Sequence, residues 1–284
     1  MKKYLIFFAL FLLWSASLHS QDIDISGLIA KSESLANQGD FYGALIALET
    51  LLVSDQKSDF QEKALWQTNA FCETLISDSI LLEEFERSFF SSVTDDKMPS
   101  DEDYTNWEKI TNLNRLGADI GFDHLAHLYS YGYGFLKRLV DLYPESKFRP
   151  SAEYYLIDEG YNSFEAVEKW LSDLYSYINK YEGSTIKELD IACLDIALIC
   201  HNLWQLLTYP DEYTELFSSG DTAADSDRAA KYKSAALKYY SKVIISGYRG
   251  RFKDTIQRED IIELFNDIKR GEKSSRLLFI IIYD

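Results

Sequence analysis

Apolar residues recur along this chain at alternating steps of three and four positions, the spacing of one face of an α-helix. Two of these stripes are long. The first contains Phe164, Val167, Leu171, Leu174, Ile178 and Tyr181, and the second contains Ile186, Leu189, Cys193, Ile196, Cys200, Leu203 and Leu207. Shorter stripes precede Pro144 and Gly247. The pattern predicts an all-α fold.

Composition favours the same fold. Hydrophobic residues make up 46% of the 284 residues and charged residues 26%, close to the values of ordinary globular proteins. The chain holds only 13 Gly and 4 Pro, which is too few for the many turns of a β-sandwich, a β-barrel or a Gly-rich phosphate loop. We therefore expect long helices that pack into a sizeable core.

The first twenty residues have the pattern of an export signal. Lys2 and Lys3 precede an apolar run over residues 4–14, and small residues follow between Ser15 and Ser20. The run is too short to span a membrane, which takes about 20 apolar residues. The nearest cysteine is Cys72, so no Cys stands at the cleavage region for a lipid anchor. These features predict a cleaved signal peptide over residues 1–20 and a periplasmic or secreted protein with no stable membrane anchor.

Three cysteines in an exported chain raise the question of a disulfide. Cys193 and Cys200 lie seven residues apart in a helical pattern, which places their Cα atoms about 10 Å apart, beyond the reach of a disulfide. Both also belong to one apolar stripe. We expect Cys72, Cys193 and Cys200 to be buried free thiols.

Residues 35–52 have the pattern of two helices joined by a tight turn. Gly39 breaks the first helical pattern, Asp40 and Phe41 begin the second, and the small residue Ala44 follows Phe41 by three positions. A small residue at this place lets two helices approach closely. Gly39, Asp40, Phe41 and Ala44 resemble the turn of a tetratricopeptide repeat (TPR), a family of two-helix repeats.

A second turn pattern, a tyrosine followed by turn residues at the end of a helical stripe, occurs three times. Its residues are Tyr143, Pro144 and Ser146, then Tyr181 and Gly183, then Tyr248 and Gly250. The tyrosines are 38 and 67 residues apart, near one and two TPR periods of 34 residues. The Tyr-Pro-Glu-Ser turn resembles that of exported bacterial TPR proteins, such as outer-membrane-assembly lipoproteins and periplasmic cell-envelope coordinators.

The resemblance covers roughly residues 25–70 and 123–256 and implies an α-solenoid, in which stacked helical hairpins bury each other's apolar faces. Residues 77–122 depart from the repeat and are expected to form an irregular insertion. The uncharged run at 277–283 is the most hydrophobic in the mature chain. We expect it to cap the open end of the solenoid, with docking to a partner as the alternative.

Two acidic segments, at 91–106 and 211–228, carry no apolar stripe and are expected to be exposed loops. They divide the mature chain into segments of about 25–93, 107–210 and 228–284. The last segment is too short to bury much surface alone. We therefore expect one helical-repeat domain over residues 21–284.

One short segment has metal-binding potential. On a helix, Asp123 and His127 would lie four positions apart and His124 and His127 three, so neighbouring side chains could contact one ion. The glutamate of a His-Glu-x-x-His metalloprotease helix is missing. We favour a solvated helix face here over a metal site.

Other catalytic patterns are incomplete. Asp221, Asp225 and Asp227 lack the alternating ligands and central Gly of an EF-hand. His201 directly follows Cys200, and adjacent side chains on a helix diverge by about 100°, which argues against a nucleophile pair. We expect no catalytic residue, no metal site and no cofactor.

The formal net charge of −17 would repel nucleic acid and anionic lipid. The 20 tyrosines would suit a surface that binds proteins. These features favour a non-enzymatic TPR-like adaptor that binds a protein or peptide partner in the cell envelope. The alternative is a helical small-ligand-binding accessory protein of a solute transporter, or a carboxylate-dependent hydrolase. A deep pocket with converging Asp, Glu and His would favour the alternative.

Overall fold

The computed structural model describes residues 24–54, 57–77, 101–123, 128–157, 164–209, 221–246 and 258–274. The expected signal peptide, the turn residues Tyr248 and Gly250, and the apolar run 277–283 lie outside the described residues. The chain divides into two compact units, Met1–Leu142 and Tyr143–Asp284. The division falls inside the middle one of the three segments expected from the sequence.

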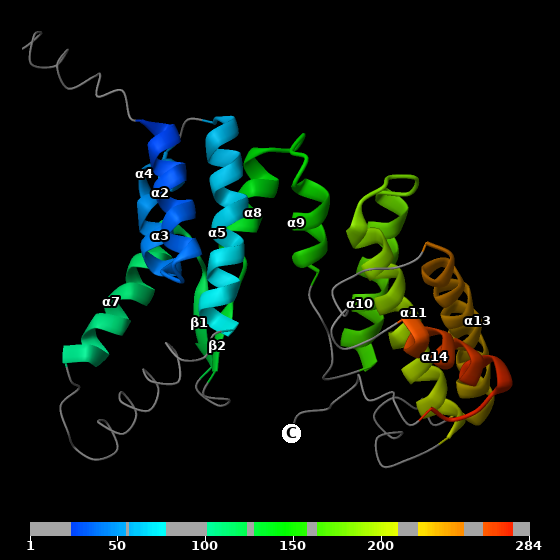
Figure 1. Ribbon diagram of the computed structural model, residues 1–284. Coiled ribbons are helices and arrows are strands. Elements are labelled where there is room, and N and C mark those ends of the chain that lie inside the picture. The colour runs from blue at the N-terminus through cyan, green and yellow to red at the C-terminus, as the bar shows by residue number, and fades with distance from the viewer. Residues whose placement is uncertain are drawn as a thin grey trace, which may run out of the picture. The chain divides into compact units, whose positions relative to one another are not determined.

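The described residues of the first unit form helices and one β-hairpin (Figure 1). Its elements are α2 (Ile25–Asn37), α3 (Phe41–Ala47), α4 (Glu49–Leu52), α5 (Asp59–Ser77), α7 (Asp101–Leu116), β1 (Ile120–Asp123), β2 (Leu128–Tyr131) and α8 (Gly134–Leu142). Helix α5 packs against α3 and α4 and against α8. Its core includes the fully buried side chains of Leu45, Leu48, Leu52, Leu65, Phe135, Leu136 and Leu139.

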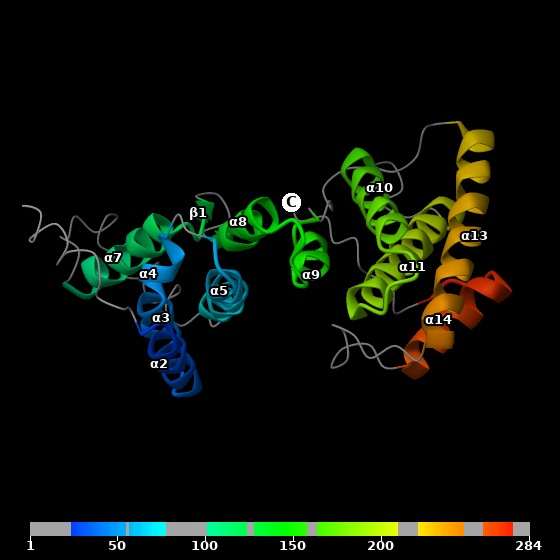
Figure 2. The same cartoon turned by 90° about the horizontal axis from the view of Figure 1, so that it is seen from above.

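The second unit is helical throughout its described residues. Its elements are α9 (Arg149–Tyr155), α10 (Phe164–Lys180), α11 (Lys187–Thr208), α13 (Thr222–Ser246) and α14 (Arg258–Arg270). Helix α11 lies between α10 and α13, and α14 packs against α13 (Figure 2). Every residue of α11 from Ile191 to Gln205 is buried, because most of its side chains are apolar and polar ones such as Asp195 and His201 contact neighbouring helices.

Helix α11 is also long and apolar enough, by length and composition, to cross a membrane. Within its most apolar window, however, 83% of the residues are buried inside the unit. A helix at the centre of a packed core can be as long and as apolar as a membrane-spanning helix. Its packing between α10 and α13 accounts for its apolarity.

The predicted helical character is confirmed, with 11 helices in the described part of the chain. The antiparallel hairpin of β1 and β2 was not predicted; it pairs Ile120 with Tyr131 and Asp123 with Leu128. Hydrogen bonds to the side chain of Asn114 fix the beginning of strand β1. Asn114 accepts a hydrogen bond from the Ile120 amide at 2.7 Å and donates one to the Ile120 carbonyl at 2.9 Å, just after α7 ends. Gly117 turns the chain with φ +101°.

The expected acidic loops at 91–106 and 211–228 are wrong over part of their length. Helix α7 already begins at Asp101, and α13 begins at Thr222. Carboxylates stabilise the first turn of a helix, where backbone amides lack partners. Asp221 does so directly, since its side chain accepts hydrogen bonds from the amides of Ala223 and Ala224. Acidic composition here marks the starts of helices.

Candidate functional site

The turn at Gly39 joins α2 and α3. Gly39 has φ +82°, a left-handed conformation that favours glycine. The Asp40 carboxylate accepts a hydrogen bond from the Gly43 amide at 2.8 Å and caps α3. Ala44 is fully buried, and its carbonyl accepts a hydrogen bond from the Ser32 hydroxyl of α2 at 2.9 Å. A larger residue at position 44 would therefore press against α2.

The turn at Pro144 separates α8 from α9. The turn spans Tyr143 to Ser146, and the Ser146 amide donates a hydrogen bond to the Tyr143 carbonyl at 3.0 Å. The Ser146 hydroxyl then accepts a hydrogen bond from the Phe148 amide at 3.0 Å. Arg149, at the start of α9, donates to the Pro144 carbonyl at 3.0 Å and fixes the turn.

Glu153 on α9 ties this turn to the next one. It accepts hydrogen bonds from Arg149 at 2.6 Å and from the Tyr181 hydroxyl at 2.9 Å, and it also pairs with Lys180. Burial raises the pKa of Glu153, but the hydrogen bonds from Lys180, Arg149 and Tyr181 outweigh it, so the pKa is lowered. The structure thus connects the Pro144 and Tyr181 turns through one ionised carboxylate.

The turn after α10 contains Tyr181 and Gly183, and Gly183 has φ +83°. Tyr181 lies 5.1 Å, centroid to centroid, from Tyr177, which lies 5.7 Å from Tyr154. The Tyr154 hydroxyl donates to the Asp195 carboxylate of α11 at 2.6 Å. This row of tyrosines holds α9, α10 and α11 together, and Tyr154 and Tyr177 are buried.

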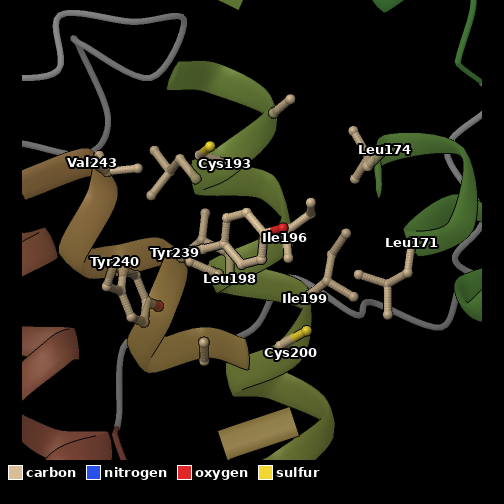
Figure 3. Close-up of a cluster of buried hydrophobic side chains, with 14 of the residues drawn as sticks. Leu171, Leu174, Cys193, Ile196, Leu198, Ile199, Cys200, Tyr239, Tyr240 and Val243 are labelled. Carbon is tan, nitrogen blue, oxygen red and sulfur yellow. The ribbon is translucent and has the colours of Figure 1, made fainter. Parts of the chain in front are cut away.

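The predicted buried free cysteines are confirmed, since Cys72, Cys193 and Cys200 are all buried and unpaired with each other. Cys193 and Cys200 lie on α11 between residues of α10 and α13 (Figure 3). Burial raises the pKa of Cys193 to about 11 and that of Cys200 to about 12. Thiols this buried remain protonated and are poor nucleophiles.

His201 lies in the same core and is fully buried. Its Nδ1 is 3.2 Å from the Tyr240 hydroxyl of α13, while Cys200 instead lies 3.8 Å from the Tyr175 hydroxyl. Burial lowers the pKa of His201 to about 3. The structure therefore separates the adjacent Cys200 and His201 into different contacts, as the helical angle between them predicts.

The expected helix at Asp123 is wrong, because Asp123 is the last residue of strand β1. The strand follows a Gly117 turn and pairs with β2, so helical spacing does not apply. His124 and His127 lie outside the described residues. Asp225, another candidate, pairs with Arg228 at 3.0 Å. No group of three or more His, Cys, Asp or Glu side chains that could hold a metal ion occurs among the described residues.

One surface was missed by the sequence analysis. The exposed face of α13 carries Lys231, Ser234, Lys238, Lys242 and Ile245, and we refer to these five residues as the basic face. Steps of three, four and seven residues place them in one row. The segment 228–246 contains five basic residues and no acidic one. Counting charge by segment would have revealed this row in a chain that is acidic as a whole.

One aromatic ring lies beneath two of these lysines. The ammonium groups of Lys238 and Lys242 are each 5.2 Å from the centroid of the buried Tyr239 ring. At this distance the ring attracts a cation. Both lysines therefore have a favoured position on the surface of α13.

Comparisons of the chain with protein families, with curated proteins and with solved structures found no match. The functional argument consequently depends on the residues and their geometry.

Proposed function

We propose that this chain is an exported, non-enzymatic TPR-like adaptor that binds a protein or peptide partner in the bacterial cell envelope. The observation that carries the proposal is that its potentially reactive side chains form structural contacts between helices. Glu153, Asp195 and His201 are each bonded to a neighbouring helix or turn, and each contact fastens one helix to another. Groups held in this way support a scaffold.

The hairpins α2–α3 and α10–α11 are the units that we propose as repeats. Each has a Gly in the left-handed region between its helices, Gly39 in one and Gly183 in the other. In each pair the two helices pack against one another. Stacking of such hairpins in a solenoid would leave long helix faces open for contact with other proteins.

The tyrosines contribute to this scaffold more than to an open surface. Tyr154, Tyr177, Tyr239 and Tyr240 are all buried within the second unit. We therefore propose that a partner binds exposed helix faces, and that the tyrosines determine how rigidly these faces are held.

Native mass spectrometry can test the proposal. The mature chain would be isolated gently from the envelope fraction of its own source and examined without denaturation. We expect a stoichiometric complex with another polypeptide. A chain that instead carries a small-molecule adduct, and no polypeptide, would support the solute-binding or hydrolase alternative and contradict the adaptor.

A further inference from the structure

We propose that the basic face of α13 binds an acidic helical segment of the partner protein. This inference rests on the proposed adaptor function, and it names the chemistry of the partner and the place where it binds. Lys231, Lys238 and Lys242 would pair with carboxylates, and Ile245 would contact an apolar side chain beside them.

The charges on this face are available for a partner. Lys231, Lys238 and Lys242 are exposed, and none forms an ion pair with a carboxylate in the described part of the chain. Some exposed lysines elsewhere in the described residues are paired, as Lys63 is with Glu33 and Lys137 with Asp119, whereas others, such as Lys31, Lys57 and Lys147, form no ion pair there. What distinguishes α13 is that three such lysines lie in one row on a single helix face.

The arrangement is unfavourable for the isolated helix. Lys238 and Lys242 are four positions apart, where two like charges on a helix repel each other. Their attraction to the Tyr239 ring offsets part of this repulsion and limits the positions that the ammonium groups adopt. Positively charged groups that are held in place before binding lose less entropy when a carboxylate arrives.

The spacing of the lysines fits a helix as the partner. From Lys231 to Lys242 the face extends over about 16 Å, at a rise of about 1.5 Å per residue. Carboxylates on a partner helix at steps of seven and four residues would meet the three lysines along this length. An acidic helix is also compact enough to contact α13 alone.

The overall charge argues against a membrane or a nucleic acid as the partner. Acidic residues outnumber basic ones by 46 to 29, so an extended anionic surface would also meet many carboxylates of this chain. Screening at physiological salt limits the range of such charges to about 8 Å. A narrow acidic helix would cover a smaller area around the lysines and would therefore meet fewer of the other carboxylates than an extended surface would.

An apolar contact would complete the interface. Ile245 lies three positions beyond Lys242 on the same face, and 85% of its surface is exposed. It is one of three large hydrophobic residues that are strongly exposed in the described part, with Val53 and Phe60. A partner helix with an apolar residue next to its carboxylates would cover it.

The test uses the mature full chain and a labelled alanine-based helical peptide of about 18 residues, long enough for helix to form. Its glutamates repeat the steps of seven and four residues, and a matched peptide carries glutamine at the same positions. Binding is followed by fluorescence anisotropy at low and at physiological salt. The basic-face variant combines Lys231→Gln, Lys238→Gln and Lys242→Gln. Its control combines Lys31→Gln, Lys57→Gln and Lys147→Gln, three exposed lysines that do not belong to α13 and whose substitution produces the same change in net charge.

We expect the glutamate peptide to bind more tightly than the glutamine peptide, with an affinity that decreases as salt increases. The basic-face variant should lose about tenfold in affinity, as for three exposed ion pairs, and the control variant should retain it. Circular dichroism would verify that both variants remain helical. The single variant Ile245→Ser should also weaken binding without changing its salt dependence.

Three results would overturn the inference: equal binding of the two peptides, equal losses in the two triple variants, or lysine-dependent binding to phosphatidylglycerol vesicles without binding to the peptide. If native mass spectrometry still finds a polypeptide partner, the adaptor function stands and only the assignment of the basic face fails. If it finds a small-molecule adduct alone, the adaptor function itself fails.

Discussion

Ala44 is the residue on which the packing of the first helical hairpin depends most directly. Its side chain is fully buried, and its carbonyl bonds to Ser32 of the facing helix α2. Ala44→Leu should overpack this contact and reduce the free energy of unfolding by about 1–3 kcal/mol. Urea denaturation would measure the loss. Ala70→Leu, at an exposed position of α5, is the control and should change the free energy by less than about 0.5 kcal/mol. Equal effects of both substitutions would contradict the close approach at Ala44.

His201 should make folding sensitive to pH. Its pKa is about 3 in the folded protein and about 6.5 in an unfolded chain, so only the unfolded chain takes up the proton between these values. The free energy of unfolding should therefore decrease as pH falls below about 6.5, by up to about 1.4 kcal/mol per pH unit from this residue. Urea denaturation of the wild type and of His201→Gln between pH 7.5 and 5.5 provides the comparison. Identical slopes in the two proteins would show that His201 is not buried as a neutral imidazole.

Among the elements, α9 is joined to the end of α10 by one carboxylate, that of Glu153. Glu153→Gln would leave Arg149 and Lys180 without their anion and should reduce the free energy of unfolding by about 1–3 kcal/mol at pH 7. Amide hydrogen exchange should accelerate first in α9. Because the pKa of Glu153 is lowered, its stabilising effect is present above about pH 4.3 and is lost as pH falls through the folded-state pKa.

Glu145→Gln offers a matched control for Glu153. Glu145 is exposed in the Pro144 turn and forms no ion pair among the described residues. Its substitution should leave both stability and exchange in α9 unchanged. Comparable effects of the two substitutions would indicate that general charge, and not the Glu153 contacts, governs α9.

Which elements could be predicted from sequence depends on how local their causes are. The apolar stripes of α10 and α11 are periodic and were predicted, whereas the burial of α11 on all sides was not. The break at Gly39 was also anticipated from local sequence, and the structure has a left-handed residue there. Helix α7 was partly missed because its first turn, from Asp101, is acidic and carries no stripe. The β1–β2 hairpin depends on contacts such as Asn114 with Ile120, which no period in the sequence indicates.

The candidate surface was missed for a related reason. The formal charge of −17 describes the chain as a whole and conceals the basic segment 228–246. The tyrosines were predicted to lie on a binding surface, but a side chain such as Tyr240 can be buried when its hydroxyl has a partner, here His201. Tertiary contacts of this kind decide which aromatic residues are buried, and a sequence alone does not contain them.

At the scale of the whole molecule, the apolar run 277–283 is predicted from sequence to cover an apolar end of the helical array. It contains seven uncharged residues, five of them Leu or Ile. Deletion of residues 277–284 should lower the melting temperature and promote aggregation, because the surface that the run covers would become exposed. Differential scanning calorimetry and light scattering would measure both. A truncated chain that melts unchanged and stays soluble, but loses a partner, would favour docking instead.

The proposed adaptor function requires that an exposed helix face contacts another protein in the cell. A photoreactive amino acid introduced at Ser234, within the basic face of α13, would report such contact, and Ser172 on the exposed side of α10 would serve as the reference position. We predict a discrete polypeptide adduct from Ser234 after illumination of intact cells, and a much smaller yield from Ser172. The absence of any polypeptide adduct from Ser234, in a chain that is exported and folded, would contradict the account.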